Sequence, residues 1–414
     1  MQNIVIEKPY EFVPPHRGHG WPNLIQRFRL IDYYLRKSQG IVDWEVRHDE
    51  RLAASLAAGH GILLAPNHCR PDDAVVMGFL GRKVKTHVFA MASWHLFHQD
   101  RFTAWAIRKM GGFSVNREGI DRQAINTAID ILRTAERPLI LFPEGAVSRT
   151  NDRLHALLDG VAFIARSAAK RRSREVAGGQ VVVHPVALKY LFLDELAPAL
   201  DPVLTEIEHR LTWRPQRQLN LLDRITNVGL ALLALKEIEY LGRPQSDRFE
   251  VRLQRLIDRL LHPLELEWLG EESSGPVVPR VKALRMKILP DMVRGSIEAV
   301  ERERRWRHLE DIYLAQQVSS YPADYLSTHH SATRLLETVE RFEEDLTDKT
   351  RVYGRMKVII EVGEAITVSP DRDRQATVDP LMERIERDLS ALLNRLSHES
   401  KMVDFGSGST VMNQ

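Results

Sequence analysis

Residues 61–81, GILLAPNHCRPDDAVVMGFLG, contain the strand–turn–helix pattern that decides the fold. The first five of them, GILLA, form a short apolar run that predicts a buried strand. Pro71 and Asp72 are typical of the first turn of a helix, and the apolar sequence after them predicts that this helix continues to Gly81. We therefore expect a strand of a buried sheet that leads through a polar turn into a helix.

The same alternation of short apolar strands and amphipathic helices extends to about residue 190. It is typical of an α/β fold with a central, mostly parallel sheet and helices on both faces of the sheet. The predicted strands are IVDWEV (41–46), GILLA (61–65), THVFAMA (86–92), FSVN (113–116), PLILF (138–142) and QVVVHPVAL (180–188). The other predicted helices are DERLAASLAAG (49–59), RFTAWAIRKMGG (101–112), DRQAINTAIDILRTA (121–135) and HALLDGVAFIARSAAKR (155–171).

The pattern changes after Leu191. Residues from about 200 to 348 are rich in Leu, Glu and Arg and predict helices almost throughout, as in FEVRLQRLIDRLLHPLELEWL (249–269), with no evident internal repeat. A strand returns in RMKVIIEVGEAITV (355–368), and a helix follows in DPLMERIERDLSALLNRL (379–396). We interpret this as one α/β domain interrupted by a large all-helical insertion, which is tolerable because the entropy of loop closure grows slowly with loop length.

This interpretation divides the chain into five segments. They are an N-terminal helical segment (1–44), the α/β core (45–199), the helical insertion (200–349), the returning strand and helix of the core (350–398) and a flexible tail (399–414). Within the first segment, WPNLIQRFRLIDYYLRK (21–37) predicts one amphipathic helix. Such a helix either packs against the body of the protein or lies on a membrane surface, and the sequence leaves both interpretations open.

The overall composition limits which partners and which cellular compartment we expect for the protein. The 58 basic and 56 acidic residues nearly cancel, so no overall charge favours nucleic acid as a partner. A single cysteine excludes an internal disulfide and a multi-cysteine zinc site. The first residues lack the basic-then-apolar order of a signal peptide, and no apolar run reaches the roughly eighteen residues of a membrane-spanning helix. We expect a cytoplasmic protein whose contact with a membrane is peripheral.

The polar turn of residues 66–73 holds a histidine and an aspartate at a spacing that suits acid–base chemistry. His68 follows the end of the predicted strand, and Asp73 lies in the first turn of the predicted helix. A carboxylate on one imidazole nitrogen fixes the tautomer, leaves the other nitrogen to accept a proton and stabilises the imidazolium that results. The pair is therefore a candidate general base with its orienting carboxylate.

Other interpretations of this turn compete with that one. A polar loop with an N-terminal helix cap explains the same residues without any chemistry. A metal site has less support, because His68, Cys69, Asp72 and Asp73 are crowded and no HExxH pattern accompanies them. Cys69 as a nucleophile would need a base, but adjacent residues of an extended chain point to opposite sides, so we expect a small buried cysteine.

Two further stretches carry candidate binding residues. In MGGFSVNREG (110–119), Arg117 stands at the exit of a short strand, where a guanidinium could bind an anion through two nitrogens. In LILFPEGAVSRTND (139–152), Glu144 emerges at the carboxyl end of a strand, which is where open α/β folds build their sites. Arg149 is a second possible anion ligand. Taken singly, these residues are equally typical of a surface ion pair and a strand-terminating turn.

Together the blocks NHCRPDD (67–73), GGFSVNR (111–117), FPEGAVSR (142–149) and VVVHPVAL (181–188) resemble, in order and spacing, the four sequence blocks of the glycerolipid acyltransferases. That family includes the 1-acylglycerol-3-phosphate acyltransferases. The resemblance covers about residues 45–195. It also extends to VIIEVGEAITV, which is similar to a glycine–glutamate strand of the family. In the family this strand closely follows the fourth block. Here it comes about 170 residues later, where the insertion is predicted to end.

This chain departs from the family pattern in its charged residues. Arg70 stands where the family often has a small hydroxyl residue, and Ala146 and Val147 replace the usual threonine and arginine after Pro-Glu-Gly. A lysine common on the second strand is Ser93 here. These changes leave His68 unaltered, so they bear on the acceptor more than on the reaction.

The resemblance implies transfer of an acyl group from acyl-CoA or acyl-ACP to a hydroxyl of a glycerol phosphate or lysophospholipid, as in phospholipid biosynthesis. It implies no metal and no bound cofactor. It implies His68 as the base and Asp73 as its orienting residue. The residues that it implies for substrate binding are Arg117 for the acceptor phosphate, Glu144 and Gly145 for the shape of that pocket, and Asn67 as a positioning group. Arg149 or Arg70 is expected to replace the arginine that the family has after Pro-Glu-Gly.

Two alternatives stay open beside this expectation. The acceptor could be a compound other than a glycerophosphate, such as an amino-lipid or a polyol. The chain could also be a catalytically weak lipid-binding or scaffolding protein that acts through the helical insertion, although the presence of both His68 and Asp73 argues against this.

Overall fold

The computed structural model describes residues 6–212, 214–295, 297–322, 324–326, 330–349, 351–372, 375–376 and 378–405. The chain divides into two compact units. One, here called the α/β unit, comprises Pro9–Leu191 and Met356–Glu399; the other, the helical unit, comprises 192–355 with the two chain ends, 1–8 and 400–414. The tail predicted at 399–414 lies outside the described residues from 406 onward.

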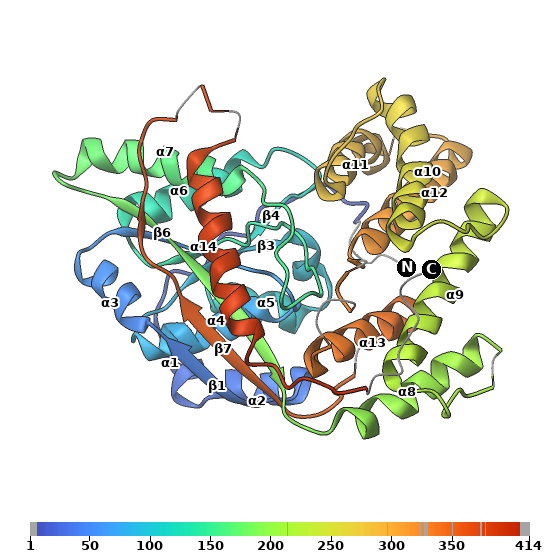
Figure 1. Ribbon diagram of the computed structural model, residues 1–414. Coiled ribbons are helices and arrows are strands. Elements are labelled where there is room, and N and C mark those ends of the chain that lie inside the picture. Colours follow the sequence, from blue (N-terminus) through green and yellow to red (C-terminus); the bar gives the residue numbers. More distant parts are fainter. Residues whose placement is uncertain are drawn as a thin grey trace. The chain divides into compact units, whose positions relative to one another are not determined.

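A mostly parallel sheet forms the centre of the α/β unit (Figure 1). The strands run in the order β1-β7-β6-β2-β5-β3-β4 across the sheet. Parallel pairings join β1 to β7, β2 to β5 and β6, and β3 to β4 and β5, whereas β8 pairs with β6 in the antiparallel sense. The strands are β1 (Ile41–Arg47), β2 (Gly61–Pro66), β3 (Phe89–Ser93), β4 (Gly112–Val115), β5 (Leu139–Ile140), β6 (Val181–Phe192), β7 (Met356–Val362) and β8 (Ile366–Thr367).

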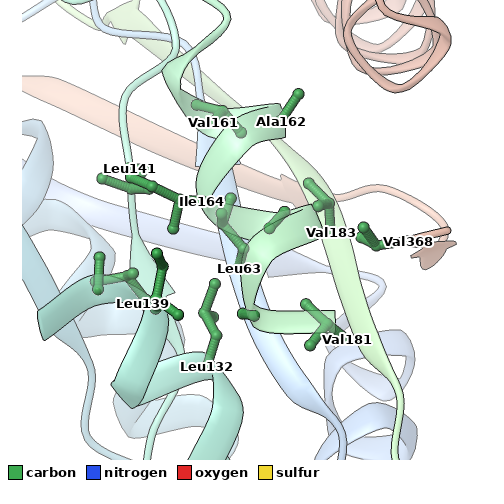
Figure 2. Packing of buried hydrophobic residues seen from close by; sticks show 14 of the residues in the cluster. Leu63, Leu132, Leu139, Leu141, Val161, Ala162, Ile164, Val181, Val183 and Val368 are labelled. Atoms are coloured by element: carbon green, nitrogen blue, oxygen red, sulfur yellow. The ribbon is translucent and has the colours of Figure 1, made fainter. Parts of the chain in front are cut away.

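Helices cover both faces of this sheet, which confirms the predicted fold class. Leu63 and Ala65 of β2 pack in one apolar cluster with residues of α6, α7 and α14 (Figure 2). Their neighbours Ile62 and Leu64 point to the opposite face and are buried as well. The helices of the unit are α1 (Gly20–Arg27), α2 (Leu30–Gln39), α3 (Asp49–Ala57), α4 (Asp73–Lys83), α5 (Arg101–Lys109), α6 (Arg122–Thr134), α7 (Gly160–Glu175) and α14 (Pro380–Ser397).

Two predicted elements are each divided in the structure. The helix expected at 21–37 is two helices, α1 and α2, because Arg29 adopts a left-handed backbone conformation (φ 52°) that a helix cannot contain. The strand expected at 355–368 breaks after β7, where the Gly363 N–H donates to the carbonyl oxygen of Pro185 (2.7 Å). A Cβ at position 363 would lie 2.8 Å from that oxygen, so the approach requires glycine.

The helical unit is built from helices that pack on their neighbours in sequence. An apolar cluster joins residues of α9, α10, α11 and α12, among them Leu256, Leu284 and Ile312. In the part of the chain that the structure describes, no helix combines the length and apolar character that crossing a bilayer needs. The helices are α8 (Leu196–Arg210), α9 (Leu221–Leu241), α10 (Phe249–Leu269), α11 (Val277–Arg294), α12 (Ala299–Ser319) and α13 (Ala332–Thr347).

Three successive joints of this unit repeat one arrangement, here called the Glu–Arg clasp. A buried glutamate near the end of one helix accepts a backbone N–H eight residues later and two N–H groups from an arginine in the first turns of the next helix. The clasps are Glu208 with Gln216 and Arg224, Glu237 with Gln245 and Arg252, and Glu265 with Ser273 and Arg280. The expectation of no internal repeat is thus wrong. The repeat consists of only two charged residues per joint, and it is difficult to recognise in the sequence because all these helices share the same amphipathic periodicity.

Candidate active site

His68 and Asp73 meet at the carboxyl end of β2, as the sequence predicts. His68 lies just beyond the strand and Asp73 is the first residue of α4, which places His68 Nδ1 2.9 Å from Asp73 Oδ2. The Asp73 side chain is fully buried, whereas the His68 side chain is 17% exposed. The imidazole stacks on the ring of Phe142, with centroids 3.9 Å apart. Because Nδ1 faces Asp73, Nε2 is the nitrogen left for another molecule.

Asp73 receives hydrogen bonds from two further groups that fix its orientation. The Arg70 N–H donates to Oδ2 (2.8 Å) and the Tyr190 hydroxyl donates to Oδ1 (2.5 Å). Burial, and then the charge of Asp73, raise the pKa of Tyr190 well above its usual value, so the phenol stays a donor. An ionised carboxylate only accepts hydrogen bonds, so His68 carries its proton on Nδ1 and a lone pair on Nε2.

Glu144 contacts the backbone of His68, a relationship that the sequence did not reveal. Its Oε1 accepts the His68 N–H (2.7 Å) and its Oε2 accepts the His155 N–H (3.0 Å). Burial raises the pKa of Glu144 to about 8, against the opposing effect of these two donors. Residues 155–159, predicted as helix, belong instead to the loop that Glu144 binds, and α7 begins only at Gly160.

Arg117 bonds to Gly145 rather than to Glu144. Its terminal Nη2 donates to the Gly145 carbonyl oxygen at 2.5 Å. Gly145 has φ 69°, a left-handed backbone conformation that favours glycine, and a Cβ there would also press on the end of the Leu158 side chain. Burial lowers the pKa of Arg117, but a guanidinium remains charged in proteins. A guanidinium has five N–H donors, so one bond to Gly145 fixes Arg117 while leaving donors for an anion.

Asn67 and the loop that carries Arg149 hold the site together. The side-chain amide of Asn67 is buried and bonds both to the N–H (2.7 Å) and to the carbonyl (3.1 Å) of Leu188 on β6. These two bonds attach Asn67 to the sheet beside β2. Arg149 has a left-handed backbone (φ 57°) and follows Ser148, whose N–H donates to the His68 carbonyl (2.7 Å).

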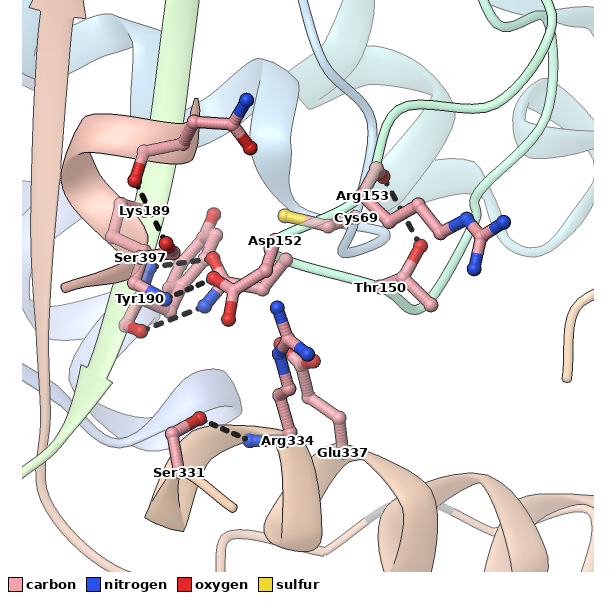
Figure 3. A network of polar contacts seen from close by, with 12 residues as sticks. Cys69, Thr150, Asp152, Arg153, Lys189, Tyr190, Ser331, Arg334, Glu337 and Ser397 are labelled. Atoms are coloured by element: carbon pink, nitrogen blue, oxygen red, sulfur yellow. Dashed lines mark hydrogen bonds and ion pairs between the residues drawn. The ribbon is translucent and has the colours of Figure 1, made fainter. Parts of the chain in front are cut away.

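A second asparagine repeats this attachment two residues further along β6. Asn151 accepts the Tyr190 N–H (2.8 Å) and donates to its carbonyl (2.9 Å). The adjacent Asp152 pairs with Lys189, both fully buried, and the Thr150 hydroxyl donates to the Arg153 carbonyl (Figure 3). The described pairing of β2 with β6 ends at Val186, so the side-chain amides continue the backbone bonding beyond it.

Arg70 and Cys69, the remaining polar residues of the turn, are both buried. The Arg70 guanidinium stands 5.2 Å above the ring of Tyr190 and donates to Gln39 Oε1 (3.3 Å). This departure from the family pattern thus supports the tyrosine that bonds to Asp73. Among the described residues, no three or more His, Cys, Asp or Glu side chains are arranged to hold a metal ion.

Tyr190 is the residue of the site that sequence reasoning missed. It lies in KYLF, directly after the fourth block, and its signal is a polar residue within an apolar strand. Only the pairing of β6 beside β2 brings it to Asp73, which is 117 positions earlier in the chain.

Residues 43–189 match the acyltransferase family, and this range includes His68, Asp73, Arg117 and Glu144. A stretch of 110 residues is 38% identical to a 1-acyl-sn-glycerol-3-phosphate acyltransferase of Streptococcus pneumoniae (strain ATCC BAA-255 / R6). The aligned part covers 27% of this chain and 38% of that protein.

Proposed function

We propose that the protein, whose residues 43–189 match the acyltransferase family, transfers an acyl group from a thioester to a hydroxyl of a glycerol phosphate or a lysophospholipid. The observation that carries the proposal is the position of the His68 imidazole. Its Nδ1 contacts the buried carboxylate of Asp73, which also accepts hydrogen bonds from the Arg70 N–H and the Tyr190 hydroxyl, and its Nε2 remains for substrate. Acyl-CoA and acyl-ACP are the donors considered, and phospholipid synthesis is the process that such a product would serve.

In the proposed reaction, His68 Nε2 accepts the proton of the acceptor hydroxyl while its oxygen attacks the thioester carbonyl. A C–O bond forms, the tetrahedral intermediate collapses, and the C–S bond breaks. The proton passes from the imidazolium to the leaving sulfur. Asp73 holds the ring in the required tautomer and stabilises the positive charge that His68 carries between the two proton transfers.

Arg117 is proposed to bind the acceptor phosphate. Its guanidinium is anchored by Gly145, which follows Glu144 directly, and Glu144 binds the backbone of His68. The cation and the base are thus joined through one short loop, so a phosphate on Arg117 would present its hydroxyl at a defined position. Correct placement of two reacting groups supplies a large part of catalysis in such transfers.

A lipid acceptor also requires contact with a membrane, and we propose that α1 and α5 provide it. Trp21 and Trp105 from these helices meet edge to face with centroids 4.8 Å apart, and Phe102 stacks on Trp105. Phe28, directly after α1, is 64% exposed, and Phe102 of α5 is 73% exposed. Exposed aromatic rings beside arginines are typical of surfaces that lie in the interface of a bilayer.

The test is turnover of purified protein with acyl-CoA or acyl-ACP and a panel that contains glycerol 3-phosphate, lysophosphatidic acid, an amino-lipid and a polyol. We expect product with a phosphate-bearing acceptor and its loss in His68→Ala. His209→Ala, at an exposed histidine of α8, is the matched control and should keep wild-type turnover. Turnover that survives His68→Ala would reject the base, and product only from the amino-lipid or polyol would reject the acceptor class.

A further inference from the structure

A group of basic side chains lies where the strands of the sheet begin, at the end opposite to the one that carries His68. Arg137 precedes β5, His87 precedes β3, and Arg108 with Lys109 precede β4. These three strands are neighbours in the sheet and run parallel, so their amino ends meet at one edge. His68 emerges at the carboxyl ends, and the two places are therefore separate.

Arg137 is the centre of this group, and most of its hydrogen-bonding capacity is unused. Its side chain is buried, with the residue 4% exposed, and its guanidinium lies over the ring of Phe89 at 4.9 Å. One nitrogen donates to the Arg17 carbonyl, but Nε and Nη1 have no hydrogen-bond partner among the described residues. A buried cation with unsatisfied donors is unfavourable, and contact with an aromatic ring offsets only part of that cost.

Arg17 brings further positive charge close to Arg137, and Arg108 and Lys109 bring it close to His16. Burial, followed by Lys109, Arg108 and Arg137, lowers the pKa of His16. Burial, followed by Arg137 and His19, lowers the pKa of His87. Glu136 is the carboxylate described beside Arg137, and it also forms an ion pair with Arg17. The neighbouring cations therefore oppose one another, and a bound anion would relieve both this repulsion and the unsatisfied donors of Arg137.

We propose that a second ligand site lies at the amino ends of β3, β4 and β5 and binds a phosphate group through Arg137. A planar guanidinium with two unused nitrogens matches the oxygens of a phosphate. Residues 14–17 bond to Arg137 and Arg108. The proposed binding requires this segment to move, because Arg137 is buried. This proposal is independent of the acyl-transfer reaction.

Two sources can supply that phosphate. The basic group leads directly into the two helices that carry the exposed aromatic rings: His19 precedes α1, and Arg108 and Lys109 end α5. A phospholipid headgroup could therefore reach Arg137 from a bilayer in which Trp21 and Trp105 lie. A free phosphate or a soluble phosphate ester presents the same oxygens, so the experiment must separate the two sources.

Titration calorimetry with inorganic phosphate, at constant ionic strength set with chloride, tests the site. We expect saturable binding to wild type and a dissociation constant about tenfold or more higher for Arg137→Gln, since a charge-assisted bidentate contact is lost. Arg171→Gln, at an exposed arginine of α7, should bind as wild type does. If Arg137→Gln fails to fold, His87→Gln replaces it, with an expected weakening of about threefold.

Sedimentation with vesicles distinguishes the sources. Phosphatidylcholine vesicles are compared with vesicles that also contain phosphatidic acid. If the second kind binds more protein and Arg137→Gln removes the difference, the ligand is a headgroup; if only soluble phosphate responds to the substitution, the ligand is soluble. Absence of phosphate binding to wild type, or equal binding by Arg137→Gln, would overturn the proposal.

Discussion

The Tyr190 hydroxyl donates a 2.5 Å hydrogen bond to Asp73 Oδ1, the carboxylate oxygen that does not contact His68. The tyrosine comes from β6 and the aspartate from the start of α4, so the bond joins two elements on which the base depends. It holds the carboxylate from the side opposite His68. The orientation of the imidazole is therefore set by a residue that does not touch it.

Replacement of Tyr190 by phenylalanine tests this relationship. Loss of one hydrogen bond to a buried charge should lower kcat about tenfold to a hundredfold, with little change in KM, because the hydroxyl orients the base rather than the substrate. Tyr34→Phe removes an exposed phenol that donates to the neighbouring Asp72 (3.1 Å) and should leave kcat unchanged. A loss of activity that only tracks a lower melting temperature would contradict an orienting role.

Glu144 should make stability depend on pH. Its folded-state pKa of about 8 exceeds the value of about 4.3 expected for an unfolded chain. Because the folded pKa is the higher one, the stability that the carboxyl contributes is fully present below about pH 4 and is lost as pH rises towards 8. The free energy of unfolding of wild type, measured against Glu144→Gln in urea, should fall by about 3 kcal/mol between pH 5 and 8.

The matched control for that titration is Glu175→Gln, at an exposed glutamate that pairs with Arg133. Its stability relative to wild type should stay nearly constant over the same interval, since an exposed pair contributes little. A constant difference for Glu144→Gln as well would show that Glu144 is ionised throughout.

Gly145→Ala should damage both the fold of the site and acceptor binding. The new methyl would meet Leu158 and force a strained φ, at a cost of about 1–3 kcal/mol. Because Gly145 anchors Arg117, kcat/KM for a phosphate-bearing acceptor should fall by more than the loss of folded protein explains. Gly160→Ala, where a Cβ meets nothing within 4 Å, should leave both stability and kcat/KM near wild type; equal effects of the two substitutions would refute the argument.

The Glu–Arg clasps predict a sharp contrast between two glutamates of α9. Glu237→Ala removes the buried carboxylate that pairs with Arg252, whose side chain is 11% exposed, and should lower the free energy of unfolding by about 3 kcal/mol. Glu239→Ala removes only an exposed pair with Lys236 and should cost less than about 1 kcal/mol. Urea denaturation monitored by circular dichroism compares the two, and similar midpoints would argue against a structural role for the clasp.

The proposed membrane contact through α1 and α5 should be prevented by a charged residue among the exposed aromatic rings. Phe102→Glu should lower the fraction of protein that sediments with phospholipid vesicles at least severalfold, because a charged side chain does not enter the bilayer interface readily. Phe163→Glu, at an aromatic residue of α7 that is also exposed, serves as the control and should sediment like wild type. Unchanged sedimentation of Phe102→Glu would place the membrane surface elsewhere.

The sequence by itself determined the fold class and the local pairing of His68 with Asp73. Strand and helix periodicity depends on neighbours a few positions apart, so the alternation up to residue 190 and the helical insertion could be predicted. The spacing of His68 and Asp73 across one strand–helix turn is equally local, and their 2.9 Å contact follows from that turn. Breaks such as the one at Arg29 could not be predicted, because an unusual φ at a single residue leaves no mark on periodicity.

Only the tertiary structure decided the relationships between distant segments. Sheet order brings Tyr190 to Asp73, the loop after β5 carries Glu144 to the backbone of His68, and parallel strand starts gather the cations around Arg137. The physical reason is common to all three. A hydrogen bond or a Coulomb interaction depends on distances of a few ångströms, and for residues far apart in the chain that distance is set by how the strands and helices pack.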